Sequence, residues 1–111
     1  MYGFFAEYVS PEKTVISILD PDGKTIASRD VRIAKASFIQ SLTNEMITLS
    51  HEQELYHNDI FGIGIIVNPT RTLEWETEQQ FKRDVEASFG FKAFVGESRD
   101  AVKSWLLTSA S

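Results

Sequence analysis

The chain has 111 residues, no cysteine and a formal net charge of −5 at pH 7. This length is typical of one domain with a single hydrophobic core. The absence of cysteine excludes disulfides, thiolate zinc sites and a cysteine nucleophile, and the acidic balance argues against a general nucleic-acid binder, which needs clustered Lys and Arg. The N-terminus MYGFFAEY has no basic signal-peptide region, and no apolar run approaches the ~20 residues of a membrane span. We therefore expect a cytoplasmic protein without a membrane partner.

The first third of the chain has the composition of β-strands. GFFAEYV at 3–9, TVISILD at 14–20 and KTIASRDVRI at 24–33 are rich in aromatic and β-branched residues. SPEK at 10–13 and DPDG at 20–23 are turn sequences. Three strands joined by tight turns predict an antiparallel meander, with Ile26, Val31 and Ile33 as the apolar positions of the third strand.

A helix is predicted next, followed by a strand of unusual composition. Apolar residues recur every three or four positions from Phe38 to Leu49, with Ser37 as the expected N-cap and an end near Glu54. Residues 56–59 are expected to form a loop. The stretch DIFGIGIIV at 59–67 is too short and too uniformly apolar for a surface helix. It predicts the central parallel strand of a sheet, covered on both faces.

Two more helices flank a last short strand. Thr77 and Gln80 have capping-box spacing at the start of a helix that Gly90 ends. FKAFV at 91–95 predicts a strand, and Ser98 is expected to cap a final helix with Asp100 in its first turn. The apolar positions of these two helices are Phe81, Val85 and Phe89 in the first, and Ala101, Val102, Trp105 and Leu106 in the second.

The order of elements is three strands, a helix, a strand, a helix, a strand and a helix. Right-handed crossovers place the fourth and fifth strands parallel to the first. We therefore predict one α/β domain over 1–111 with a ribonuclease-H-like layout, as in half of an actin-like ATPase. Its sheet should be mixed, five-stranded and ordered 3-2-1-4-5.

Four segments, in the right order, resemble the N-terminal domain of the ROK family, which contains bacterial sugar kinases and sugar-responsive transcriptional repressors of the NagC type. ILDPDGKTIASRDVRI resembles the second and third strands of that family, and FGIGIIV at 61–67 resembles its "GIGIGVPG" strand. LEW at 73–75 with SFGFKAFV resembles "lgW…LeerlGlPVyV", and VGESRDAVKSWL at 95–106 stands where the family has "VENDANAAALAE".

The chain departs from the kinase pattern at the positions that carry chemistry. The glycine-rich "DxGxT" phosphate turn of the kinases is replaced by SPEK at 10–13, where Pro11 has no amide N–H and Glu12 repels phosphate. Aligned without gaps, the catalytic aspartate position of "END" holds Ser98 and the asparagine before it holds Glu97. Ser98 cannot take up a proton unaided at neutral pH. The "PGPV" loop is replaced by NPTR at 68–71.

The resemblance implies a non-catalytic, sugar-sensing-type domain of a transcriptional regulator, expected to be a piece of a longer chain. Its expected ligand residues are Asn68, Glu97, Ser98 and Asp100, and no catalytic residue, cofactor or metal is expected. A sugar or sugar phosphate bound together with a second lobe, and a second copy of the chain, are the expected partners. The alternatives are half of a sugar kinase and a free-standing interaction domain.

Several of these residues also have plain structural interpretations. Gly62 and Gly64 suit either a ligand that approaches the backbone or a helix that packs closely on the strand. Ser98 and Asp100 are explained by helix capping alone. His51 and His57 are expected to be surface residues, because the sequence offers no third metal ligand beside them.

Overall fold

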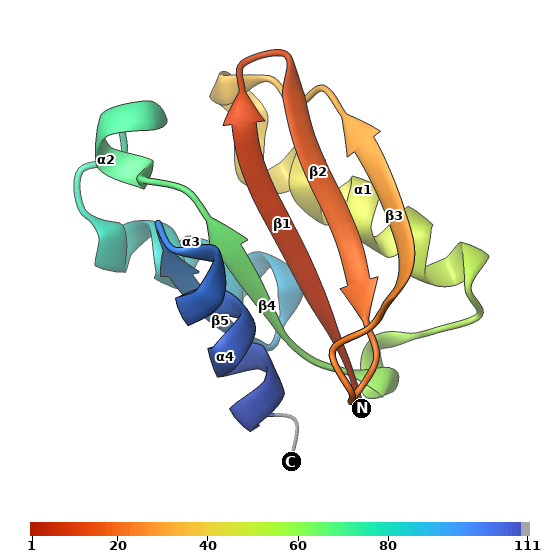
Figure 1. Ribbon diagram of the computed structural model, residues 1–111. Coiled ribbons are helices and arrows are strands. Elements are labelled where there is room, and N and C mark those ends of the chain that lie inside the picture. The colour runs from red at the N-terminus through yellow and green to blue at the C-terminus, as the bar shows by residue number, and fades with distance from the viewer. Residues whose placement is uncertain (110–111) are drawn as a thin grey trace.

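A mixed β-sheet with helices on both faces organises residues 1–109, which are the part of the chain that the computed structural model describes (Figure 1). The strands and α-helices, in chain order, are β1 (Tyr2–Ser10), β2 (Lys13–Leu19), β3 (Thr25–Val31), α1 (Phe38–Glu52), β4 (Ile60–Ile66), α2 (Pro69–Thr72), α3 (Glu78–Phe89), β5 (Lys92–Gly96) and α4 (Arg99–Ser109). Two 3-10 turns lie at Lys35–Ser37 and His57–Asp59. Within these residues, no helix has the length and apolar character needed to cross a bilayer.

The strand order is β3-β2-β1-β4-β5, which confirms the predicted sheet. β2 is antiparallel to β1 and β3, whereas β4 is parallel to both β1 and β5. The glycine-bearing strand β4 is therefore an interior parallel strand, as expected from its composition. β4 lies between β1 and β5 and is the central one of the three parallel strands, as predicted for 59–67.

The two faces of the sheet are covered unequally. On one face, α1 and α3 pack over the whole sheet and close the main core. On the other face α4 lies in front of β4 and β5, and the hairpin of β2 and β3 is left without a covering helix (Figure 1). The smaller core under α4 consists of Phe5, Leu19, Ile66, Val102 and Leu106. The face of β2 and β3 beside α4 is therefore not covered by a helix (Figure 1).

The glycines of β4 make room for α4. A Cβ atom on Gly64 would lie 2.4 Å from Val102 Cγ1, and one on Gly62 would lie 2.8 Å from the backbone oxygen of Lys92 in β5 and 3.1 Å from Trp105 Cη2. The ring of Trp105 stacks on Phe94, with ring centroids 5.5 Å apart. Both glycines therefore allow close packing of α4, and Gly62 also leaves room for the backbone of β5.

Two predictions of which residues are buried, one in β3 and one in α4, were wrong. Ile26 is 40% exposed, because the residues of β3 that face α1 are Ala27, Arg29 and Val31. Ala101 is exposed, because α4 contacts the sheet through a narrower stripe than its apolar residues suggested.

The ends of α1 also differ in detail from the sequence prediction. Ser37 occupies the N-cap position of α1, but its hydroxyl contacts Ser41 Oγ at 3.1 Å and makes no capping bond. The helix ends at Glu52, and the predicted loop 56–59 contains a 3-10 turn in which Asp59 Oδ2 accepts from Tyr56 N.

The N-cap of α3 gives a direct test of a local sequence signal. Thr77 Oγ1 accepts from Gln80 N at 3.0 Å, as predicted, while the Gln80 side chain turns to Asp84 instead of closing the capping box. Thr77→Ala should lower the free energy of unfolding by about 1 kcal/mol. Thr77→Ser should lower it much less, because serine keeps the capping hydroxyl. Thermal unfolding of both variants measures this difference. Equal melting temperatures for Thr77→Ala and the parent would show that this cap contributes nothing.

Candidate functional site

The carboxyl ends of the parallel strands β1, β4 and β5 meet at one edge of the sheet. In open α/β sheets this edge is the usual place for a ligand, where the chain connections diverge to opposite sides. A shallow cavity of 180 Å³ lies there. Its lining residues are Tyr8 from β1, Ile66, Val67 and Asn68 from the end of β4, Arg71 and Thr72 from α2, and Glu97 after β5.

Two of the four predicted ligand residues line this cavity. Asn68 follows β4 and Glu97 follows β5, so the parallel pairing of these strands places both at the same opening. Ser98 and Asp100 do not line it. Ser98 Oγ accepts from Ala101 N at 3.3 Å, and Asp100 is exposed in the first turn of α4. The predicted set therefore separates into two cavity residues, the capping residue Ser98 and the exposed Asp100 in the first turn of α4.

Arg71 is a cavity residue that the sequence analysis missed. The segment after β4 is the short helix α2, whose N-cap Asn68 accepts through Oδ1 from Arg71 N at 3.1 Å and from Thr70 Oγ1 at 3.0 Å. Asn followed by Pro69 is the N-cap and N1 pair of a helix start, and this signal could have been read from the sequence. The capping directs the Arg71 guanidinium toward Glu97, with 3.6 Å between Nη2 and Oε1.

The cavity offers hydrogen-bonding groups rather than a concentrated charge. The side chains of Arg71 and Glu97 are 79% and 64% exposed, so their ion pair is weak and both can turn to a ligand. Asn68 Oδ1 is already used twice, which leaves the amide NH₂ group of this side chain as a donor. A guanidinium, an amide and a carboxylate in one shallow opening match the alternating donors and acceptors of a polyhydroxy compound.

The turn between β1 and β2 does not form an anion cradle. Pro11 has no N–H, and the N–H of Glu12 donates to Ser10 Oγ at 3.2 Å. The Glu12 carboxylate stays at this turn, 3.2 Å from the Arg32 guanidinium. A triphosphate at this position would meet the Glu12 carboxylate, and neither Pro11 nor Glu12 would offer it a free amide N–H.

The two histidines lie away from this cavity. His51 and His57 are exposed, with their rings 5.2 Å from Tyr56 and 5.7 Å from Phe91, measured between centroids. Across residues 1–109, no three His, Asp or Glu side chains come together as a set of metal ligands.

Comparison with known proteins gives a fold but no family. No family model matches the chain, and no curated protein matches it. Among solved structures, the Lmo2764 protein of Listeria monocytogenes, a proposed N-acetylmannosamine kinase, superimposes with a TM-score of 0.56 at 17% identity. A ROK family transcriptional regulator, homologous to the E. coli MLC protein, gives 0.59 at 11% identity, and YeaZ from Pseudomonas aeruginosa gives 0.52 at 11%.

The fold is that of one half of an actin-like ATPase. The similarity covers 86%, 84% and 85% of this chain in the three structures, in the order given above. It covers 34%, 27% and 42% of those chains, so this chain spans less than half of each. Identities this low establish the fold alone, and the three structures include both a proposed kinase and a transcriptional regulator.

Proposed function

We propose that this chain is the N-terminal α/β domain of a ROK-type transcriptional regulator, and that it senses a sugar without catalysing phosphoryl transfer. The observation that carries the non-catalytic part is the β1–β2 turn, where Pro11 and Glu12 offer no free amide to a phosphate. The second support is Ser98, which stands at the expected position of the catalytic base and is engaged in capping α4.

The sugar-sensing part of the proposal rests on the cavity at the strand ends. Asn68, Arg71 and Glu97 form one wall of a sugar site, and a second lobe supplies the opposite wall. A sugar or sugar phosphate is the proposed ligand, and a second copy of the chain is a proposed partner. The surrounding chain, rather than this acidic domain, would provide any contact with DNA.

Thermal unfolding with ATP and Mg²⁺ tests the non-catalytic part. An intact nucleotide site at a hundredfold excess of ligand over its dissociation constant would stabilise the domain by about 2.7 kcal/mol, which is roughly 10 °C for a domain of this size. We expect no measurable shift of the melting temperature. A concentration-dependent rise with ATP, absent with Mg²⁺ alone, would contradict the proposal and favour half of a sugar kinase.

An NMR titration with glucose, N-acetylglucosamine and N-acetylmannosamine tests the sugar part. The expected result is a set of weak, saturable amide shifts confined to Asn68, Arg71 and Glu97 and their neighbours. Glu97→Ala should weaken these shifts, and Glu76→Ala, which changes an exposed carboxylate outside the cavity, should not. Shifts that are absent for all three sugars, or that map elsewhere, would count against a sugar at this edge.

A further inference from the structure

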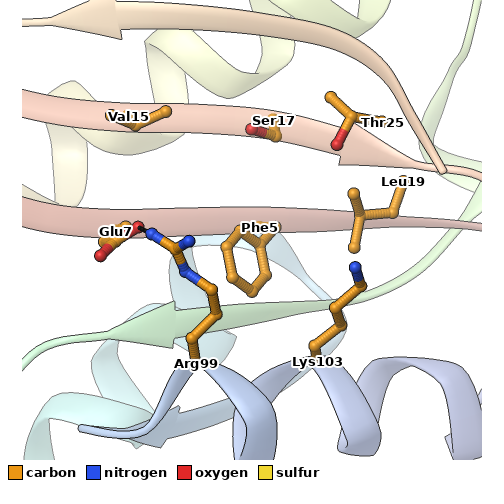
Figure 2. Close-up of a pocket in the computed structure, with 8 residues that line it drawn as sticks. All are labelled: Phe5, Glu7, Val15, Ser17, Leu19, Thr25, Arg99 and Lys103. Carbon is orange, nitrogen blue, oxygen red and sulfur yellow. Dashed lines mark hydrogen bonds and ion pairs between the residues drawn. The ribbon is translucent and has the colours of Figure 1, made fainter. Parts of the chain in front are cut away.

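A second recess lies on the open face of the sheet. It has a volume of 240 Å³ and runs between α4 and the outer face of β1 and β2 (Figure 2). Its apolar floor comes from Phe5, Leu19 and Val15, and Ser17 and Thr25 contribute hydroxyl groups. None of its lining residues lines the cavity that contains Asn68 and Glu97. We call this recess the α4 groove.

Two basic side chains of α4 stand over the α4 groove. Arg99 and Lys103 are four residues apart, so they project from the same side of the helix, toward the sheet (Figure 2). Arg99 forms an ion pair with Glu7, whose side chain is 26% exposed, at one end of the groove. The Lys103 ammonium group forms no hydrogen bond or ion pair with any residue in 1–109, and Figure 2 shows the side chain extending toward Leu19.

The charge of the α4 groove is opposite to that of the chain. Arg99 and Lys103 against Glu7 leave one net positive charge, whereas the whole chain carries −5. The groove is also bounded at its far end, because the β2–β3 turn meets the C-terminal part of α4. A Cβ atom on Gly23 would lie 2.8 Å from Leu107 Cδ2. An uncompensated ammonium group above a bounded apolar floor is a binding arrangement for an amphipathic anion.

We propose that the α4 groove binds a small monocarboxylate with an apolar body. The carboxylate pairs with the Lys103 ammonium and receives a second hydrogen bond from Arg99, while the body of the ligand covers Phe5 and Leu19. A single net positive charge selects a monoanion, because a second negative charge would be repelled by Glu7. The volume of 240 Å³ is below the range of about 300–1,000 Å³ for drug-sized ligands, so the ligand is a short acid.

A pair of probes of nearly equal size separates the charged from the apolar contribution. Hexanoate and 1-hexanol are titrated into ¹⁵N-labelled protein, and the amide shifts are followed to saturation. We expect hexanoate to shift the amides of Phe5, Ser17, Leu19 and Lys103, and hexanol to bind several-fold more weakly at the same place. Equal affinities for the two probes would overturn the carboxylate assignment.

A matched pair of variants tests the role of Lys103. Lys103→Gln should weaken hexanoate binding about fivefold, the effect of losing one partly exposed ion pair, and should leave hexanol binding unchanged. Lys82→Gln removes an exposed lysine on α3, on the opposite face of the sheet, and should have no effect. Both positions are exposed, so both variants should fold. Equal effects of the two substitutions would show a general charge effect and overturn the proposal.

The remaining outcomes are equally decisive. Hexanoate shifts that fail to saturate, or that centre on Asn68 and Glu97, would reject the α4 groove as the site. Sedimentation analysis identifies a second copy as the occupant, if a dimer forms and dissociates on addition of hexanoate. That result would replace the small-acid proposal with a self-association surface. The sugar titration concerns the strand-end cavity and the ATP titration concerns the β1–β2 turn, so a failure here leaves the proposed function untouched.

Discussion

Gly64→Ala should destabilise the domain by about 1–3 kcal/mol, although alanine normally suits a strand better than glycine does. The added methyl group would lie 2.4 Å from Val102 Cγ1 and 3.2 Å from Leu106 Cδ1. Val102 and Leu106 are 0% and 2% exposed, so neither side chain can move aside into solvent. To relieve the overlap, α4 must move away from β4, and this movement loosens the packing of the smaller core between α4 and the sheet. Gly64→Val should cost more than Gly64→Ala for the same reason.

Chemical denaturation of a double-mutant cycle measures this contact. Val102→Ala removes the methyl groups that the new side chain would meet, so the double variant Gly64→Ala/Val102→Ala should lose less stability than the sum of the single losses. Gly96→Ala is a matched control on β5, because its Cβ would lie 3.3 Å from Phe94 Cε1 and 3.4 Å from Val102 Cγ2. It should cost clearly less than Gly64→Ala. A neutral or stabilising Gly64→Ala would show that α4 does not pack against β4 at this distance.

This packing also connects the core to both candidate sites. α4 begins two residues after Glu97 of the strand-end cavity, and its first turn leads to Lys103 over the α4 groove. The position of α4 is set by the absence of side chains at Gly62 and Gly64. The glycines that resemble a ligand-binding motif in the sequence therefore act on ligand residues indirectly, by placing the helix that carries them.

The sheet could be predicted because the residues of each strand carry the pattern that indicates it. Alternating apolar and polar residues, many of them β-branched or aromatic, predicted the three strands of the meander. An uninterrupted apolar run predicted that β4 is an interior strand. The handedness of crossovers then supplied the strand order. The exposure of Ile26 could not be derived in the same way. Consecutive strand residues alternate between faces, and the sequence does not show which face α1 covers.

The sites were less predictable because they depend on contacts between distant segments. The four residues of α2 are too few to show a helical period, so Arg71 was read as part of a loop. Its proximity to Glu97 follows only from the parallel pairing of β4 and β5. The α4 groove likewise joins Arg99 and Lys103 to Glu7, more than ninety positions earlier in the chain. The ligand roles of Ser98 and Asp100 stay predictions, because sequence position alone does not separate capping from binding.

Phe81→Ala should have the largest effect on stability of any substitution considered, about 3–5 kcal/mol. Phe81 is 0% exposed and lies between two aromatic neighbours, with ring centroids 6.2 Å from Phe38 of α1 and 5.1 Å from Trp75. Trp75 is also held by a hydrogen bond from Nε1 to Asp84 Oδ2 at 3.0 Å. Losing the Phe81 ring therefore leaves a cavity in the main core and removes one of the contacts that hold the Trp75 side chain.

Fluorescence separates these two consequences, because Trp75 and Trp105 are the only tryptophans in the chain. In a Trp105→Phe background, Trp75 reports alone, and Phe81→Ala should both lower the midpoint of urea unfolding and shift the native emission to longer wavelength. Phe81→Leu retains most of the buried volume and should give a much smaller loss with little change in emission. A loss below about 1 kcal/mol for Phe81→Ala, or an unchanged native spectrum, would contradict the anchoring of Trp75. Such a result would imply that the buried Leu73 and the hydrogen bond from Trp75 N to Pro69 O are enough to hold the segment between α2 and α3.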